Sequence, residues 1–297
     1  MEMKKVQILL STYQGEQFLE EQIESLLAQT WKNIEILVRD DGSQDGTREI
    51  LRNYSEKYKN ILFYEGKNIG VTKSFFELLK KSTAEYVAFC DQDDMWLNNK
   101  IESAILKLEQ ETGPALYCSN KILVDDKLNP MKKQNNQELV PGFGNAVIEC
   151  ICTGCTAVLN RKLVDILISR LPEHAILHDW WSYLVASYVG TVIFDKNAYI
   201  LYRQHGKNVV GAKGGFWGNV QLKAAYLRKN QGKLKAQLSD FSRLYQGDIP
   251  KDILVQNILE AEKFSGKIKI IGNRKIYRQS VLDEVIMRIL FMINRML

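Results

Sequence analysis

The first hundred residues alternate short apolar runs with segments of helical periodicity, and this alternation limits the folds open to the chain. Four apolar runs bounded by turn residues are predicted strands: Val6 to Ser11, Ile34 to Arg39, Ile61 to Tyr64 and Tyr86 to Cys90. Between them, apolar residues recur at helical spacing from Phe18 to Leu27 and from Ile50 to Tyr58. The βαβαβαβ order predicts an α/β fold with a mostly parallel central sheet flanked by helices. Ligands of such sheets bind beyond the carboxyl ends of the strands.

The pattern becomes looser after residue 100. We expect helices at Ile101 to Glu111, Arg161 to Ser169 and Asp179 to Ser187, strands at Ala115 to Val124, Thr156 to Leu159 and Thr191 to Tyr202, and a polar connection at Asp125 to Gly144. From Phe216 onward the sequence is mostly amphipathic and helical. Glycines at 211, 214 and 215 suggest a boundary, so we predict a catalytic domain at 1–212 and a basic amphipathic helical extension at 213–297.

Composition excludes several classes of protein. The 297 residues are 45% hydrophobic and 25% charged, which is typical of a globular chain and excludes general disorder. No stretch approaches the roughly 18 uncharged apolar residues of a spanning helix, and the first residues do not resemble a signal peptide. Five cysteines are too few for a disulfide framework, so free thiols and a cytoplasmic location are expected.

Positive charge is concentrated in the C-terminal part. Residues 1–215 hold 25 Lys/Arg and 28 Asp/Glu, a net charge of −3, whereas residues 216–297 hold 15 and 7, a net charge of +8. One interpretation is a solvated helical face or a contact within a homo-oligomer. Another is an anchor at an anionic membrane surface, because apolar residues accompany the lysines and arginines. Those apolar residues are Phe216, Trp217, Leu222, Tyr226, Leu227, Val285, Ile289, Leu290, Met292, Ile293 and Met296. No nucleic-acid-binding motif or aromatic platform is present, so no nucleic-acid partner is expected.

Acidic residues follow two of the predicted strands. Asp40 and Asp41 end the second strand in RDDGSQDGT, and Asp91, Asp93 and Asp94 end the fourth in FCDQDDMW. Three carboxylates within four residues repel one another, and Mg²⁺ or Mn²⁺ relieves that repulsion while holding substrate phosphates. Taken alone, each motif has a plain alternative: a turn with a helix cap for DDGS, and a helix cap at Asp94 with solvated neighbours for DQDD.

Four motifs occur in order in this region: LLSTYQGEQFLEEQIESLLAQT, ILVRDDGSQDGT, EGKNIGV and VAFCDQDDMW. Together they resemble glycosyltransferase family 2, an inverting group with the A-type nucleotide-sugar-binding fold, over about residues 5–205. DQDD, TGCTAVLNR and ILYRQHGKNVVG are similar to segments of bacterial rhamnosyltransferases in that family. The Gln-x-x-Arg-Trp motif of processive members has no counterpart, which argues against a processive polysaccharide synthase.

The resemblance implies roles for individual residues. The nucleotide-sugar donor would be bound by Ser11, Thr12, Tyr13, Asp40, Asp41, Lys67, Asn68, Gly70, Asp91 and Arg203. Asp93, together with Asp91 and His205, would hold the divalent metal on the donor diphosphate. His205 could instead donate a hydrogen bond to the diphosphate, and an ordinary structural hydrogen bond is an equally open alternative. Cys150, Cys152 and Cys155 lack the second ligand pair that a structural zinc site requires.

Asp179 in ILHDWW occupies the position of the family's catalytic base. An inverting transfer needs one carboxylate to remove the proton of the attacking hydroxyl, and one base suffices. His178 or Trp180 would shape the surroundings of this base, and Gly154, Cys155 and Trp180 would lie on the acceptor side. The alternative is that Asp179 caps a helix whose Trp180, Trp181 and Leu184 pack in the core.

The sequence therefore predicts a metal-dependent inverting glycosyltransferase. By its similarity to rhamnosyltransferases, its donor is expected to be dTDP-L-rhamnose, and its acceptor a hydroxyl of a cell-surface polysaccharide or lipid-linked glycan precursor. A position at the inner face of the cell membrane would suit such an acceptor. Two alternatives stay open: a UDP-hexose donor, because contacts through Asp40 do not separate uracil from thymine, and a non-catalytic subunit that binds nucleotide sugars.

Overall fold

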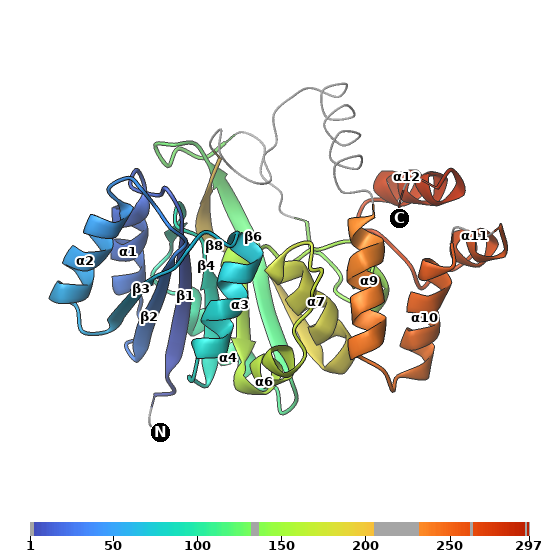
Figure 1. The fold of residues 1–297 in the computed structure, drawn as a ribbon, viewed down its shortest axis with the longest axis horizontal. Helices are drawn as coiled ribbons and strands as arrows, with labels where there is room; N and C mark the ends of the chain where they lie inside the picture. Colours follow the sequence, from blue (N-terminus) through green and yellow to red (C-terminus); the bar gives the residue numbers. More distant parts are fainter. Residues whose placement is uncertain (1–2, 132–136, 205–231, 262–263, 295, 297) are drawn as a thin grey trace.

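The computed structural model describes residues 3–131, 137–204, 232–261, 264–294 and 296. These residues contain an eight-stranded sheet with the strand order β3-β2-β1-β4-β7-β6-β8-β5 (Figure 1). The strands are β1 (Val6–Thr12), β2 (Ile34–Asp40), β3 (Ile61–Glu65), β4 (Tyr86–Cys90), β5 (Met95–Trp96), β6 (Ala115–Val124), β7 (Val158–Asn160) and β8 (Thr191–Arg203). The sheet is mixed but mostly parallel, so the predicted α/β architecture is confirmed.

Strand β1 lies in the middle of the parallel half. It pairs in parallel with β2, where Thr12 is opposite Asp40, and with β4, where Leu10 is opposite Cys90. The short strand β7 runs antiparallel to both β4 and β6, and β6 then pairs in parallel with β8. The carboxyl ends of β1, β2 and β4 therefore meet at one edge of the sheet.

Helices cover both faces of the sheet, because alternate residues of each central strand are apolar. On one face, Ile8 and Ala88 share a core with α1 (Leu19–Leu27), α2 (Thr47–Lys57) and α4 (Lys100–Leu108). On the other, Leu9 and Phe89 share a core with α3 (Val71–Lys81), α6 (Arg161–Ser169) and α7 (His178–Val189). The period-2 alternation that identified the strands thus divides the interior into two apolar layers.

Two short elements were not predicted from the sequence. Residues Met95–Trp96 form β5, which pairs antiparallel with β8, so Asp94 precedes a strand and does not cap a helix as the alternative for DQDD would have it. Residues Phe143–Ala146 form α5, at the end of the expected polar connection. Segments of two and four residues are too short to display periodicity, so tertiary pairing decides their conformation.

Four described helices follow the sheet: α9 (Lys233–Leu244), α10 (Ile249–Leu259), α11 (Phe264–Ile271) and α12 (Val281–Met292). Phe241 of α9 packs against the rings of Trp181 and Tyr188 from α7, with centroids 6.0 and 5.3 Å apart. The apolar core therefore continues from the sheet into these helices. The predicted boundary at residue 212 lies outside the described residues, and the division into two domains stays a prediction.

Helix α9 also holds the segment that leads into α7. The buried Asp240 carboxylate accepts hydrogen bonds from the backbone N–H groups of Glu173 and His174, at 2.8 and 2.6 Å. Gln237 Oε1 accepts another from the N–H of Ile176, at 2.9 Å. These three bonds fix the chain just before His178, the first residue of α7.

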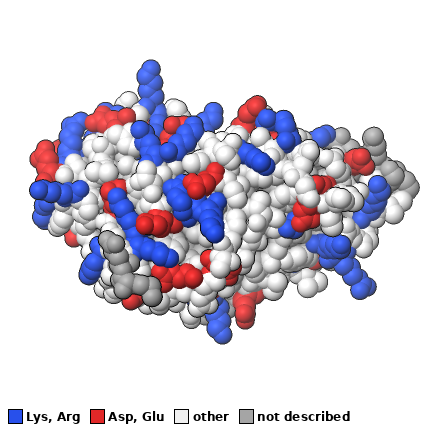
Figure 2. All heavy atoms as spheres, turned by 90° about the horizontal axis from the view of Figure 1, so that it is seen from below, with Lys and Arg blue, Asp and Glu red and all other residues white. Residues whose placement is uncertain are grey.

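Charged side chains do not form a single-sign patch on the face seen from below. Figure 2 shows Lys and Arg interspersed with Asp and Glu on that face, at the side where β1 begins. A polyanion such as nucleic acid would meet both signs of charge there. Within the described ranges, every helix is too short or too polar to cross a bilayer.

The packing of α9 on α7 leads to a stability prediction. Phe241→Ala removes a ring that is fully buried among four other aromatic rings, so we expect a loss of ~3–5 kcal/mol in the free energy of unfolding. Urea denaturation followed by circular dichroism measures this loss as a shift of one transition. Ile253→Ala on α10 is the matched control, because Ile253 is 54% exposed. A Phe241→Ala loss no greater than that of the control would contradict continuous packing.

Candidate functional site

The carboxyl edge of the sheet gathers most of the predicted site residues. The register of β1 against β2 and β4 brings the segment after Thr12, the pair Asp40–Asp41 and the segment after Cys90 to one edge. The η1 turn (Gly154–Thr156) contacts β4 at the same place, and the first turn of α7 contacts η1. Residues from distant parts of the sequence are thereby brought together.

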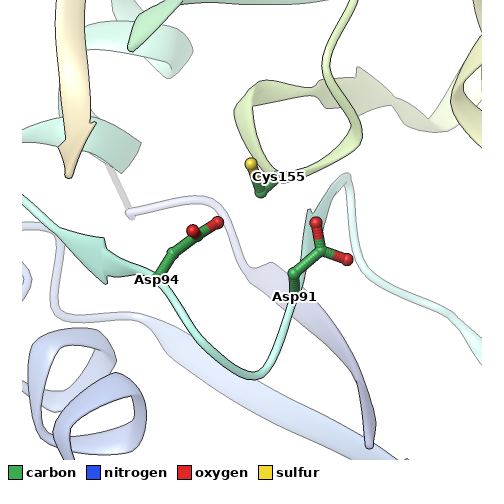
Figure 3. A group of neighbouring side chains, drawn as sticks. All are labelled: Asp91, Asp94 and Cys155. Atoms are coloured by element: carbon green, nitrogen blue, oxygen red, sulfur yellow. The ribbon is translucent and has the colours of Figure 1, made fainter. Parts of the chain in front are cut away.

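Asp91, Asp94 and Cys155 form a compact group at this edge. One ligand atom of each lies within 4.8 Å of the others, and Asp94 points toward the turn that carries Cys155, with Asp91 beside it (Figure 3). Burial, followed by the neighbouring charges of Asp94 and Asp93, raises the pKa of Asp91 well above its usual range. Burial and the charge of Asp93 raise the pKa of Asp94 to about 7. Carboxyl groups are therefore concentrated in a largely buried place where their charged forms are disfavoured unless a cation is bound.

The two aspartates fit a divalent cation. Asp94 is fully buried, and its Oδ2 has no hydrogen-bond partner among the described residues, whereas its Oδ1 accepts from the N–H of Arg203. A buried carboxylate oxygen without a partner suits a hard cation such as Mg²⁺ or Mn²⁺. The Cys155 thiol suits it less, because burial raises its pKa and keeps it protonated.

The metal ligands predicted from the sequence overlap only partly with this group. Asp91 belongs to both sets, whereas the geometry adds Asp94 and Cys155 in place of Asp93. The backbone oxygen of Asp93 accepts a hydrogen bond from Arg203 Nε at 2.9 Å. His205 lies outside the described residues. The assignment of Asp93 and His205 as ligands therefore stays a prediction.

Asp179 lies in the first turn of α7, buried and fixed by two backbone groups. Its Oδ2 accepts a hydrogen bond from the N–H of Gly154 at 2.9 Å, and its Oδ1 accepts one from the N–H of Trp180 at 2.7 Å. Burial raises its pKa to about 6. Its negative charge also contributes to the raised pKa of Asp91, so the two carboxylates share one electrostatic environment. Such an arrangement favours proton transfer near neutral pH.

The residues around Asp179 are closely packed. The His178 ring stacks on Phe75 with centroids 3.8 Å apart, and burial lowers its pKa to about 3, so it is neutral. A side chain at Gly154 would come within 2.9 Å of His178 Nε2, which explains why glycine is needed there. Trp180 Nε1 donates to the carbonyl of Ala146 at 2.7 Å, which orients its half-buried ring. Acceptor-side roles for Gly154, Cys155 and Trp180 stay predictions.

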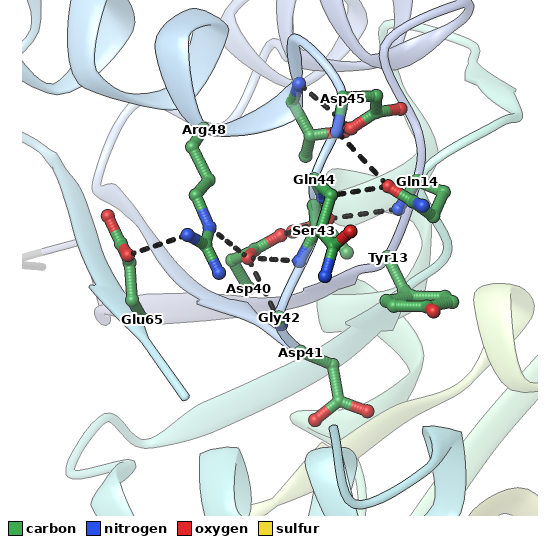
Figure 4. A network of polar contacts seen from close by, with 12 residues as sticks. Tyr13, Gln14, Asp40, Asp41, Gly42, Ser43, Gln44, Asp45, Arg48 and Glu65 are labelled. Atoms are coloured by element: carbon green, nitrogen blue, oxygen red, sulfur yellow. Dashed lines mark hydrogen bonds and ion pairs between the residues drawn. The ribbon is translucent and has the colours of Figure 1, made fainter. Parts of the chain in front are cut away.

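Asp40 has a structural environment that the sequence does not reveal. This fully buried carboxylate accepts hydrogen bonds from Thr12 Oγ1, the N–H of Ser43 and Arg48 Nε, at 3.1, 2.9 and 3.1 Å (Figure 4). It also accepts from the N–H of Gly42 at 3.2 Å. Asp40 therefore fixes the DDGS turn, and its predicted contact with a nucleotide base would require displacing one of these donors.

Asp41 points away from Asp40 and holds a different loop (Figure 4). It forms an ion pair with Arg39 and accepts hydrogen bonds from the N–H groups of Ile69 and Gly70. Arg39 Nη2 in turn donates to the carbonyl of Lys67 at 2.9 Å. The two predicted donor-binding segments, DDGS and KNIG, are thus tied together by a buried ion pair.

Other predicted donor-binding residues present accessible groups. Tyr13, Lys67, Asn68 and Gly70 are exposed, and Ser11 is half-buried with its hydroxyl 2.6 Å from that of Ser74. Gln92 links two loops of the site, because its side-chain amide bonds to the backbone N–H and carbonyl of Tyr13. Sequence reasoning missed Gln92, although it lies inside the DQDD motif.

Arg203 is buried and serves to hold loops together. Its guanidinium donates to the carbonyls of Asp93 and Asp126 and forms an ion pair with Glu21 at 2.6 Å. Its carbon Cζ lies 4.3 Å from the centre of the Phe18 ring. Arg203 therefore fixes the acidic loop from behind, and direct contact with a donor stays a prediction.

Lys121 is a functional candidate that sequence reasoning missed. Its ammonium donates to Thr153 Oγ1 at 2.8 Å and lies 4.3 Å from the centre of the Tyr202 ring. Its positive charge opposes the rise in the pKa of Asp91, Asp94 and Asp179 that burial produces. Nothing in KILV, the sequence around it, indicates this role, since only tertiary pairing brings β6 beside η1.

A pocket of about 290 Å³ opens beside the 67–70 loop. The start of α3 lines one side of it, from Gly70 to Lys73, and Pro172, Glu173 and Ala175 line the other. The pocket therefore lies between the loop held by Asp41 and the segment held by α9. The acidic residues of the site do not line it.

Comparisons with known proteins identify a family model and several relatives. The family model described as glycosyl transferase family 2 matches residues 7–167. dTDP-rhamnosyl transferase RfbG of Shigella flexneri is 29% identical over 300 residues, which cover 96% of this chain and 99% of that relative. UDP-Glc:alpha-D-GlcNAc-diphosphoundecaprenol beta-1,3-glucosyltransferase WfgD of Escherichia coli is 30% identical over 165 residues, 54% of this chain and 62% of that relative.

Solved structures share the fold. Residues 1–349 of TarS from S. aureus superpose with a TM-score of 0.60 at 15% identity, covering 98% of this chain and 81% of that one. The mannosyltransferase PcManGT from Pyrobaculum calidifontis, in complex with GDP-Man and Mn²⁺, gives a TM-score of 0.60 at 16% identity, covering 89% and 71%. At these identities the likeness shows a common architecture, including the mixed sheet flanked by helices.

The position of Lys121 predicts a change in metal affinity. Lys121→Met removes a positive charge beside Asp91 and Asp94, so Mn²⁺ should bind roughly three- to tenfold more tightly. Calorimetric titration of the full chain with Mn²⁺ measures this affinity. Lys121→Arg keeps the charge and should behave like the parent. Unchanged or weaker Mn²⁺ binding by Lys121→Met would show that its ammonium does not act on the acidic group.

Proposed function

Because the chain belongs to glycosyl transferase family 2, we propose that this glycosyltransferase moves a sugar, with inversion, from a nucleotide diphosphate donor to an acceptor hydroxyl. The matched region spans residues 7–167, and Asp179 follows it in the chain. The proposal assigns the donor to the edge formed by β1, β2 and β4 and the acceptor to the side of η1 and α7.

The fixed carboxylate of Asp179 is the observation that carries the proposal. Two backbone N–H groups orient it, and burial raises its pKa to about 6. A carboxylate with this pKa is ionised at neutral pH yet basic enough to accept a proton. The helix-cap alternative accounts for the bond from Trp180 but not for the one from Gly154, which lies outside α7.

The reaction then proceeds in one displacement. The acceptor hydroxyl gives its proton to Asp179 while its oxygen attacks C1 of the donor sugar. The bond between C1 and the diphosphate oxygen breaks on the opposite face, and the nucleoside diphosphate leaves with that electron pair. Inversion follows because attack and departure occur on opposite faces.

Charge on the leaving group has to be stabilised for this step. A divalent cation, when bound, neutralises the charge that develops on the diphosphate, and Asp91 and Asp94 would hold it. The exposed Tyr13 ring and the loop at Lys67 to Gly70 would bind the nucleotide, as the resemblance implies. Lys121 would add a second positive charge near the diphosphate.

The donor is proposed to be dTDP-L-rhamnose. The name of the RfbG relative supports this choice, because that protein aligns over nearly the whole of both chains. A UDP-hexose is the second candidate, since the name of the WfgD relative specifies UDP-glucose over a shorter alignment. A thermal-shift screen of both donors separates them, because the nucleotide sugar that binds the folded chain more tightly at equal concentration raises Tm more.

The acceptor is proposed to be a hydroxyl of a cell-surface polysaccharide or of a lipid-linked precursor. The WfgD relative is named for an acceptor on diphosphoundecaprenol, a lipid carrier. Such an acceptor would place the enzyme at the inner face of the cell membrane, as a peripheral protein. The C-terminal extension has a net positive charge, which would attract it to the anionic headgroups of that membrane.

The proposed base is tested by Asp179→Asn. We expect transfer to fall by about 10² or more while donor affinity changes little, because the amide cannot accept the proton. In the parent at saturating Mn²⁺, the transfer rate should decline as pH falls through about 6, where Asp179 becomes protonated, and the variant should lack the part of the decline that Asp179 causes. Initial rates between pH 5 and 8 measure both effects.

The control is Asp165→Asn, which changes an exposed carboxylate on the neighbouring helix α6 in the same way. It should keep the parental rate and pH profile. Transfer near the parental level in Asp179→Asn would assign the base to another group.

The proposed metal role is tested by Asp91→Asn, since Asp91 belongs both to the set predicted from the sequence and to the group seen in the structure. The donor should raise the Tm of the parent more with Mn²⁺ than without it, and this Mn²⁺-dependent part should disappear in the variant. Asp126→Asn, an exposed carboxylate nearby, should behave like the parent. If Asp91→Asn keeps the full Mn²⁺-dependent rise, metal binding through this group is ruled out.

A further inference from the structure

Helix α12 turns a wide apolar face toward solvent. Six of its twelve residues have relative exposures between 36% and 82%, and none of the six is charged or polar. They are Val281, Leu282, Val285, Ile286, Ile289 and Met292. At 3.6 residues per turn, these positions fall within one arc of about 140°. We call this surface the α12 face.

The opposite side of α12 is packed and therefore holds the face in place. Met287 and Phe291 are buried in the apolar core. Arg288 donates to the carbonyls of Ile270, Ile271 and Ile276 and pairs with Glu284 at 2.7 Å. The helix is thus anchored by its own core side and by Arg288, and the exposed face is not a consequence of loose packing.

Only some of the apolar residues expected in a membrane anchor are exposed in the structure. Val285, Ile289 and Met292 lie on the α12 face as expected, and Ile293 just beyond the helix is also exposed. Met296, however, is buried and Leu290 is packed against the core, so neither contributes to the exposed surface. The expected residues from Phe216 to Leu227 lie outside the described residues.

Positive charge predominates in the segment that carries the α12 face. Residues 264–294 hold six Lys/Arg and two Asp/Glu, a net charge of +4. Lys267 donates to the carbonyl of Met292, at the end of the face, and Lys269, Arg274 and Lys275 are exposed on α11 and the connection that follows it. An uncharged apolar face in a segment of net positive charge is complementary to a bilayer surface with anionic headgroups.

The area of the face argues against a second copy of the chain as its partner. A helix of twelve residues is about 18 Å long, and one side of it offers well under the roughly 800 Å² per partner that a stable dimer buries. Insertion at a lipid surface requires only an apolar helical face with basic residues around it. A lipid surface therefore accounts for both the apolar α12 face and the basic residues of the same segment.

We propose that the α12 face docks the enzyme on an anionic lipid bilayer, with α12 lying in the plane of the interface. In Figure 1, β1 begins at the lower side near the N-terminus, whereas α12 lies at the upper side, toward which β1 and its parallel neighbours β2 and β4 run. Docking through α12 would bring the carboxyl edge of the sheet toward the membrane. That consequence rests on the proposed function, since a lipid-linked acceptor would then reach Asp179.

The test is cosedimentation of the full-length chain with vesicles of phosphatidylcholine and phosphatidylglycerol at 3:1, and with pure phosphatidylcholine vesicles. The parent should bind the anionic vesicles and bind the neutral ones at least fivefold more weakly. Val285→Asp/Ile289→Asp places two charges on the exposed face and should weaken binding at least tenfold. Ile249→Asp/Ile253→Asp makes the same kind of change at two exposed positions on α10 and should bind like the parent.

Three outcomes would overturn the proposal: no binding by the parent, equal binding by both double variants, or a dimer of the parent that Val285→Asp/Ile289→Asp dissociates in analytical ultracentrifugation. Hydrolysis of the nucleotide sugar by the same samples serves as the second readout. It should be equal in the parent and both double variants, because the changes are remote from the sheet edge. Loss of vesicle binding by Val285→Asp/Ile289→Asp with intact hydrolysis would support the role of the α12 face. Absence of hydrolysis in the parent would instead contradict the proposed function.

Discussion

The parallel pairing of β1 with β2 on one side and β4 on the other is the constraint on which the site depends. It places the ends of three strands at one edge, so that Thr12, Asp40 and Asp91 lie on the same edge although Thr12 and Asp91 are 79 positions apart in the sequence. Backbone hydrogen bonds and two apolar layers fix this register, because a slip of one residue would exchange the residues of the two layers. The geometry of the acidic edge is therefore set by the core of the protein.

The acidic edge also carries an electrostatic cost, which the surrounding structure offsets. Asp94 and Asp179 are buried and Asp91 is half-buried, and their pKa values rise because burial disfavours the charged form. Lys121 and the N–H of Gly154 reduce this cost without removing it. A buried cluster that still lacks positive charge is suited to receive a cation together with a substrate, whereas a fully neutralised cluster would only stabilise the fold.

The sequence allowed prediction of most regular elements and of the positions where chemistry gathers. Strands such as Tyr86–Cys90 and Ala115–Val124 were predictable because their apolar runs are long and bounded by turn residues. Elements such as β5 were not, because two residues show no periodicity. Lys121 and Gln92 were missed for a related reason: their importance arises from partners that only the folded sheet brings near. Local sequence reports conformation well and long-range contact poorly.

Four of the motif aspartates show why a motif alone does not assign a role. Asp40 and Asp41 accept hydrogen bonds from internal donors, including backbone N–H groups and buried or half-buried arginines. Their carboxylates therefore fix two loops. Asp94 keeps one oxygen without a partner among the described residues, and Asp91 lies beside it. The carboxylates left with acceptor capacity are those that can serve a ligand, and the saturated ones build the frame that positions them. The sequence shows that both pairs of aspartates follow strands. Only the number of hydrogen bonds that each carboxylate accepts within the protein distinguishes the pair that fixes loops from the pair that can bind a ligand.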